Sequence, residues 1–155
     1  MHRFSAATQS EATVRAERAA IWDALSDPDL LPRLTPFLES ITVDGDRWRW
    51  EMQSVPVLGS SFNPCFTERM VFTPQERIEF THAPPPGVRE RTGVEGWYAL
   101  SDAAGGTRLG IRLEVSVELP VSRLASPAVT TAMKGVMATM GRRFAANLLD
   151  HVGAR

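Results

Sequence analysis

The chain has 155 residues, of which 43% are hydrophobic, a formal net charge of -1 and one cysteine. This length suits a single domain over residues 1–155, and the near-neutral charge gives no basic surface for nucleic acid. One cysteine excludes an internal disulfide, and no stretch reaches the roughly 20 apolar residues of a membrane-spanning helix.

The first elements are a strand and two short helices. Residues 4–15 alternate loosely with a period of two, which predicts a strand. Ile21, Trp22 and Leu25 then recur at helical spacing and predict a short helix over residues 17–26. Asp27-Pro28 ends this helix and offers the cap and first residue of a second one, which Pro32 and Pro36 keep short.

The middle of the chain has a period of two, broken by turn residues, which predicts a meander of antiparallel strands. Asp44-Gly45-Asp46 suits a tight hairpin, Thr73-Pro74-Gln75-Glu76 another turn, and three consecutive prolines from Pro84 a loop. A further turn is expected at 56–60, with Pro64 marking a bulge or an edge. The predicted strands cover residues 40–44, 47–55, 61–72, 77–82, 89–100 and 107–119.

Residues 122–152 predict one long amphipathic helix. Its apolar residues recur at steps of three and four and so share one face: Val129, Met133, Val136, Met137, Met140, Phe144 and Leu148. Ser126-Pro127 is expected to supply the N-cap and the first helical residue, and Gly153 the stop. Asn147 and His151 lie within the same stripe, one turn apart.

These elements predict an α+β fold in which a strongly curved antiparallel sheet of about six to seven strands wraps around the C-terminal helix. Three stretches of the sequence carry a family resemblance, namely Val14 to Pro28, Leu31-Pro32 and Gly105-Gly106-Thr107-Arg108-Leu109. Through them the sequence resembles the START-like, or SRPBCC, superfamily with its helix-grip fold, which includes polyketide cyclase/dehydrase-like and lipid-transfer members. The resemblance implies an apolar or amphipathic small molecule held between sheet and helix.

Four polar residues share the phase of apolar neighbours, namely Glu68, His82, Tyr98 and Asn147. A simple hairpin at residues 73–77 places Glu68 opposite His82, where the two side chains could hydrogen-bond. These groups either orient a ligand or supply acid/base chemistry, or they form a satisfied buried pair and polar ends of their elements.

We therefore take Glu68 and His82 as candidate catalytic residues. The predicted ligand-binding residues are Trp48, Trp50, Phe66, Glu68, Met70, Phe80, His82, Tyr98, Met133, Met137, Met140, Phe144 and Asn147. The aromatic and methionine residues suit a ligand cavity and an ordinary core alike. The three histidines have no metal-ligand spacing, so we expect no metal site, and we expect no cofactor.

Three hypotheses about function are compatible with these residues. The first is a cytoplasmic binding protein for a lipid, isoprenoid or polyketide-like compound; a cytoplasmic location is expected because the N-terminal residues lack a continuous apolar segment. The second is a cyclase or dehydratase with Glu68 and His82 as an acid/base pair. The third is an interaction or oligomerisation module with a filled cavity, for which a dimer is possible.

Overall fold

The architecture is a seven-stranded antiparallel sheet, one long helix and two short helices, which confirms the predicted α+β helix-grip fold. A computed structural model describes the backbone of residues 1–57 and 60–154 and, outside residues 55–62, their side chains. The elements are β1 (His2–Val14), α1 (Arg18–Leu25), α2 (Leu31–Leu34), β2 (Leu38–Asp44), β3 (Arg47–Met52), β4 (Val55–Val57), β5 (Ser60–Phe62), β6 (Cys65–Thr73), β7 (Arg77–His82), β8 (Thr92–Ala103), β9 (Gly106–Leu119), the 3-10 turn η1 (Arg123–Ala125) and α3 (Ser126–His151).

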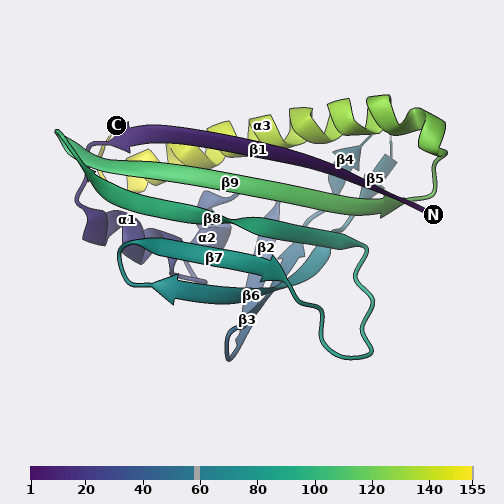
Figure 1. Ribbon diagram of the computed structural model, residues 1–155, viewed down its shortest axis with the longest axis horizontal. Helices are drawn as coiled ribbons and strands as arrows, with labels where there is room; N and C mark the ends of the chain where they lie inside the picture. The colour runs from purple at the N-terminus through teal and green to yellow at the C-terminus, as the bar shows by residue number, and fades with distance from the viewer. Residues whose placement is uncertain (58–59, 155) are drawn as a thin grey trace.

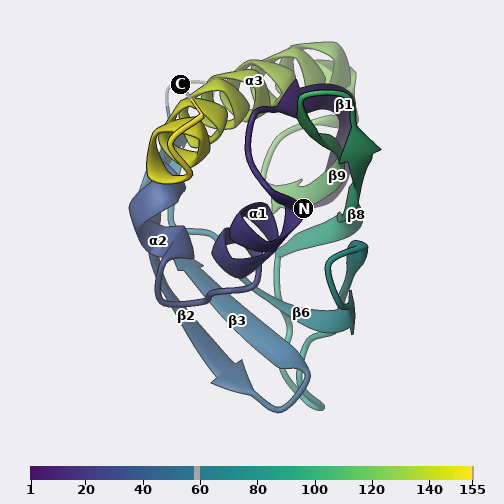
Figure 2. The ribbon, with the colours of Figure 1, turned by 90° about the vertical axis from the view of Figure 1, so that its left-hand side faces the viewer.

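The strand order is β1-β9-β8-β7-β6-β3-β2, so the strands that come first and last in the sequence, β1 and β9, are neighbours in the sheet (Figure 1). The sheet curls so strongly that its two edges face opposite sides of α3 (Figure 2). At one edge α3 runs beside β1, and at the other α2 lies between β2 and α3. The helix is therefore joined to one edge strand, β1, directly and to the other, β2, through α2. The face of the sheet turned toward α3 is called the inner face below.

Two hairpins form at the turn residues that the sequence predicted. Asp44 pairs with Arg47, so Gly45 and Asp46 form a two-residue loop, and Gly45 takes the positive φ of 62° that such a loop requires. In the next hairpin Thr73 pairs with Arg77 and sets the register of β6 against β7. The expected pairing of Glu68 with His82 is confirmed.

Two packed clusters hold the two ends of α3. The larger joins α1, α2 and the sheet to the end of the helix, with Ile21, Leu25, Ile78 and Leu148 among its most buried members. The smaller lies under the beginning of the helix and consists of Phe4, Ala6, Val117, Val129 and Met133. Between them Met137, Met140 and Phe144 remain only half-buried, so the middle of α3 is the least covered part of its apolar stripe.

Several boundaries differ from the prediction. Ser126 lies inside α3 and does not cap it, because a 3-10 turn capped by the Ser122 hydroxyl runs straight into the helix. His151 is the last helical residue and is exposed, so it does not join the apolar stripe. The expected stop at Gly153 is confirmed by its φ of 70°.

The strand expected over residues 61–72 is split. Residues of β4 and β5 pair as a separate two-stranded hairpin, and β6 begins only after Pro64. Leu58 and Gly59, in the middle of the expected turn, lie outside the described residues. The strand expected from residue 89 begins at Thr92, because Arg89, Glu90 and Arg91 belong to the preceding loop. Among the described helices, none is long and apolar enough to cross a membrane.

Candidate functional site

Glu68 is a buried acid that has no polar partner among the described residues. It lies on the inner face of β6 between Phe66 and Met70, and 2% of it is exposed. No described residue forms a hydrogen bond or an ion pair with its carboxyl group. Burial raises the pKa of Glu68 well above that of an exposed glutamate. Burial therefore favours the uncharged form of the carboxyl group, which both donates and accepts a hydrogen bond.

Tyr98 lies near this acid, on β8. Its ring centroid is 5.3 Å from that of Phe80, which lies on the strand between β6 and β8. Burial and, secondarily, the nearby Glu68 raise the pKa of the Tyr98 hydroxyl. The side chain as a whole is only partly covered, and no described residue hydrogen-bonds its hydroxyl group. Glu68 and Tyr98 thus form a pair of uncharged polar groups, called the polar pair below, on an apolar surface.

An aromatic wall borders the polar pair on β3 and β6. Trp50 stacks on Phe66 with ring centroids 5.9 Å apart, and Trp48 lies 6.5 Å from Trp50. The Nε1–H group of Trp50 is buried without an acceptor among the described residues. A buried N–H without an acceptor costs about 1–3 kcal/mol, so this wall also carries an unused donor.

The predicted apolar site residues gather in the two clusters defined above. The larger contains Trp48, Trp50, Phe66, Met70, Phe80, Tyr98, Met140 and Phe144. The smaller contains Met133 and has Met137 packed against it. The helix thus presents three methionines toward the inner face, and methionine side chains adapt readily to neighbours of different shape.

His82 does not bind Glu68, although the two residues are opposite each other in the β6–β7 ladder. Its Nε2 atom lies 2.9 Å from Oε1 of Glu90, and its backbone N–H donates to the carboxylate of Glu95. The hydrogen bond that we expected between Glu68 and His82 is therefore replaced by one to the loop between β7 and β8. This replacement leaves Glu68 without the partner that the register offered it.

Glu90 is the centre of a buried network that the sequence did not reveal. Its carboxylate accepts from the backbone N–H of Thr67 at 2.8 Å, from the Thr67 hydroxyl at 2.7 Å, and pairs with His82. The backbone of Ala83 donates to the carbonyl of Thr67, so Glu90 continues the ladder beside β6 where β7 ends. The sequence predicted Glu90 within the strand over residues 89–100, but it lies in the loop before β8, so this role was not predicted.

Asn147 has a structural partner. Its Nδ2 atom donates to the carbonyl oxygen of Leu34 at 2.9 Å and so joins α3 to the end of α2. This bond closes the edge of the sheet against the helix. The predicted ligand contact of Asn147 remains a prediction, and the structure gives its amide a partner within the chain.

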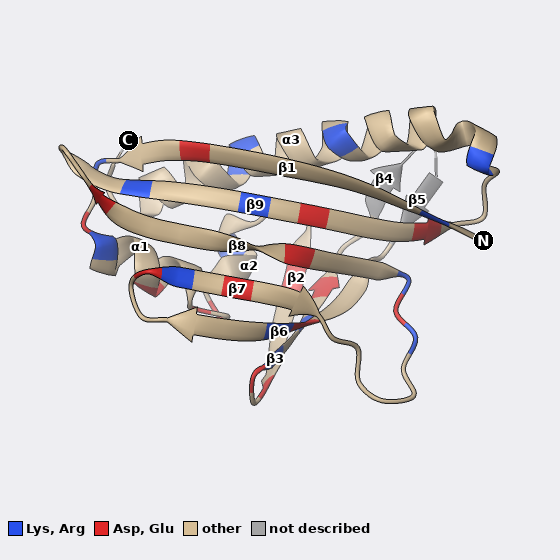
Figure 3. Ribbon diagram, viewed as in Figure 1, with Lys and Arg blue, Asp and Glu red and all other residues tan. Residues whose placement is uncertain are grey.

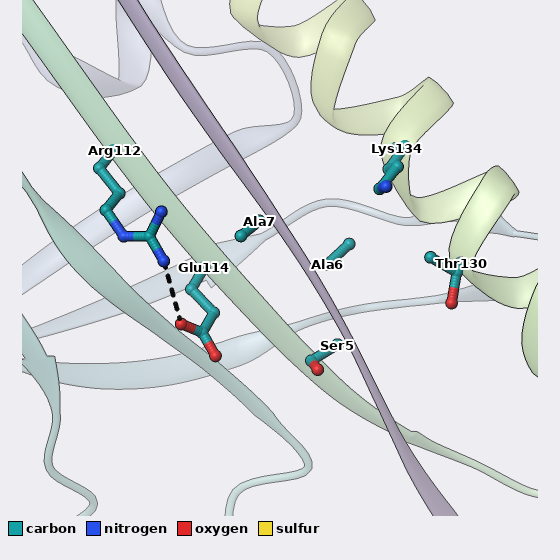
Figure 4. Close-up of a pocket in the computed structure, with 7 residues that line it drawn as sticks. All are labelled: Ser5, Ala6, Ala7, Arg112, Glu114, Thr130 and Lys134. Atoms are coloured by element: carbon teal, nitrogen blue, oxygen red, sulfur yellow. Dashed lines mark ion pairs between the residues drawn. The ribbon is translucent and has the colours of Figure 1, made fainter.

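The outside of the molecule carries mixed charge and two hollows. Charges of both signs are interspersed along β7, β8 and β9 (Figure 3). One hollow, of about 430 Å³, is lined by Ser5, Ala6, Ala7, Arg112, Glu114, Thr130 and Lys134, between β1 and α3 (Figure 4). The other, of about 440 Å³, lies where the β8–β9 turn meets Arg15 to Arg18. None of the predicted site residues lines either of these hollows.

A model of the family described as polyketide cyclase / dehydrase and lipid transport matches residues 5–151. Among solved structures, the protein TTHA0849 from Thermus thermophilus has a TM-score of 0.72 at 16% identity, over 96% of this chain and 98% of that one. A START superfamily protein from Mycobacterium smegmatis has a TM-score of 0.66 at 16% identity, over 96% and 97%. The di-domain ARO/CYC StfQ from the steffimycin biosynthetic pathway has a TM-score of 0.68 at 14% identity, over 97% of this chain and 51% of StfQ. At these identities the structural likeness concerns the fold.

Proposed function

Since the chain belongs to the polyketide cyclase / dehydrase and lipid transport family, we propose that it binds an apolar or amphipathic small molecule of the lipid, isoprenoid or polyketide kind. The ligand lies between the inner face of the sheet and α3. The observation that carries the proposal is Glu68, a buried carboxyl group without a partner among the described residues, on a surface of aromatic and aliphatic side chains.

Energetics support a functional role for this acid. Keeping a carboxyl group on an apolar surface without a hydrogen-bonding residue is unfavourable, and an apolar residue of the same shape would avoid that cost. A ligand that hydrogen-bonds Glu68 removes the cost at the moment of binding. Most of the binding free energy then comes from apolar area removed from water, at about 25 cal/mol per Å².

The half-buried middle of α3 supplies the opposite wall. Met137 and Met140 lie between the two packed clusters and retain part of their exposure. A bound apolar molecule covers these side chains and the ring of Tyr98 together. Because methionine is unbranched and flexible, this wall accommodates ligands of different shapes.

The test is binding of the neutral fluorescent probe N-phenyl-1-naphthylamine to the purified protein. We expect saturable binding to the wild type and a loss of at least about tenfold in affinity, or about 1.4 kcal/mol, in Met137→Trp. Ala138→Trp is the matched control, since Ala138 is exposed on the next position of the same helix. Absence of saturable binding, or equal loss in both variants, would contradict the proposal.

A second candidate function is catalysis of the cyclase or dehydratase kind. The uncharged carboxyl group of Glu68 is suited to donate a proton to a carbonyl or hydroxyl oxygen of a substrate. The partner first expected for it, His82, is engaged by Glu90, so we propose Tyr98 as the group that assists Glu68. Glu68→Gln would then abolish turnover while leaving the fold intact, and an unchanged rate would exclude this role.

The third hypothesis, an interaction module with a filled interior, predicts a different result. In that case the protein binds no hydrophobic probe and forms a dimer of defined size in light scattering. Saturable probe binding by a monomer would exclude it.

A further inference from the structure

The polar pair also indicates what chemistry the ligand carries. Burial favours the uncharged forms of Glu68 and Tyr98, and neither side chain has a hydrogen-bond partner among the described residues. They approach the interior from β6 and β8, on either side of Phe80. A ligand of hydrocarbon alone would leave both groups without hydrogen bonds, so it would forgo the free energy that these bonds provide.

The buried charged residues of the protein narrow the chemical class of the ligand further. Among the described residues, the buried polar and charged side chains are Thr67, Glu68, Glu90, Thr92 and Thr107. No arginine or lysine is among them. Glu90 already accepts hydrogen bonds from Thr67 and pairs with His82. A ligand carboxylate next to Glu68 would therefore find, in the described part of the chain, no buried basic side chain to neutralise it.

We infer that the ligand is an uncharged, largely apolar molecule with a carbonyl or hydroxyl oxygen that hydrogen-bonds the carboxyl group of Glu68, with the Tyr98 hydroxyl as a second donor. This inference rests on the proposed function. The site discriminates against fatty acids and other carboxylates, because a carboxylate buried beside Glu68 gains no compensating ion pair from the described residues.

The experiment uses four compounds that share one chain length: decanol, decanoate, decylamine and decane. Each displaces N-phenyl-1-naphthylamine from the full-length protein at neutral pH. We expect decanol to bind about tenfold more tightly than decanoate and about fivefold more tightly than decane, the latter corresponding to one net hydrogen bond. Decylamine is expected to bind more weakly than decanol, because a cation requires Glu68 to ionise in a buried position.

Variants assign the preference to Glu68. Glu68→Leu should abolish the preference of decanol over decane, whereas Glu68→Gln, which keeps a neutral donor, should retain it. Glu79→Leu is the matched control, since Glu79 is exposed on β7. Circular dichroism verifies that each variant folds, and Glu68→Gln answers the question if Glu68→Leu does not fold.

The outcomes separate the two proposals. If the probe binds and is displaced without a preference for decanol, or if decanoate or decylamine binds best, the inference is wrong and the proposed function stands. A preference for decanol that persists in Glu68→Leu also overturns the inference. If neither the probe nor any of the four compounds binds, the proposed function itself fails.

Discussion

The imidazole ring of His82 lies directly against the backbone of Gly93. A Cβ atom at Gly93 would lie 2.6 Å from Nδ1 and 2.9 Å from Cγ of the ring. On its other side the ring bonds Glu90 through Nε2. His82 is thus held between β8 and the loop that follows β7, and its orientation depends on the absence of a side chain at residue 93.

Gly93→Ala is therefore expected to lower the free energy of unfolding by about 1–3 kcal/mol, because the new methyl group displaces the His82 ring. The same substitution should cost much less in a His82→Ala background, where the obstructing ring is absent. Urea denaturation of both single variants and of the double variant measures this coupling. Strictly additive effects would show that the ring and the glycine do not interact.

Glu90→Ala should be among the most destabilising changes of a charged residue. It leaves the N–H and hydroxyl groups of Thr67 without their acceptor and removes the partner of His82. We expect a loss of about 2–4 kcal/mol in urea denaturation, since hydrogen bonds to charged groups contribute about 1.5–3 kcal/mol each. Glu79→Ala, at an exposed position of β7, is the control and should change stability little. Equal effects of the two substitutions would refute the structural role of Glu90.

The raised pKa of Glu68 makes stability depend on pH in a definite direction. The folded protein keeps this proton at a pH where the unfolded chain has lost it, since burial raises the folded pKa. The contribution of Glu68 to the free energy of unfolding falls as the pH rises from the ordinary glutamate pKa of about 4.3 through the folded pKa. The slope is at most about 1.4 kcal/mol per pH unit.

Glu68→Gln removes this contribution, because glutamine does not titrate. The free energy of unfolding of the variant minus that of the wild type should therefore grow as the pH rises through this window, and then level off. Urea denaturation at a series of pH values measures the difference, in which the other carboxyl groups cancel. A difference that is constant with pH would mean that Glu68 titrates normally.

Thr107 fastens the β8–β9 hairpin to the chain after β1. Its hydroxyl group donates to the carbonyl oxygen of Ala16 at 2.8 Å, and 1% of the residue is exposed. Thr107→Val keeps the shape but leaves that carbonyl without this donor, so a loss of about 1–2 kcal/mol is expected in thermal or urea denaturation. Thr81→Val, on an exposed position of β7, serves as the control. A loss no larger than that of the control would contradict the assignment.

The fold was predicted well from local sequence patterns, because the period of a strand and the length of a short turn together determine how consecutive strands pair. The hairpin at residues 73–77 placed Glu68 opposite His82 correctly, since its register depends only on a few consecutive residues. The long helix and the sheet that curves around it were likewise predicted from periodicity.

Contacts between distant segments were not predictable in this way. The bond from Asn147 to the Leu34 carbonyl and the contact of Glu90 with Thr67 join residues far apart in the sequence. Periodicity gives the face on which a residue lies but not its distant partner, and backbone groups carry no sequence signature. The packing of the apolar residues was therefore predicted, whereas the hydrogen bond of His82 was not, because a loop side chain binds the ring. The role of these residues in ligand binding stays a prediction.

The pairing of β1 with β9 has a consequence for how the chain folds. Residues 2–14 pair with residues 107–119, and within the described sheet β9 is the one neighbour of β1. During synthesis β1 is made before the other strands of this sheet but can pair only after β9 has emerged, and such non-local pairing slows folding. Its central residues, from Ala7 to Thr13, are small or polar, which limits aggregation of the waiting strand. The order of synthesis thus gives a physical reason why the middle of β1 contributes so little to the core.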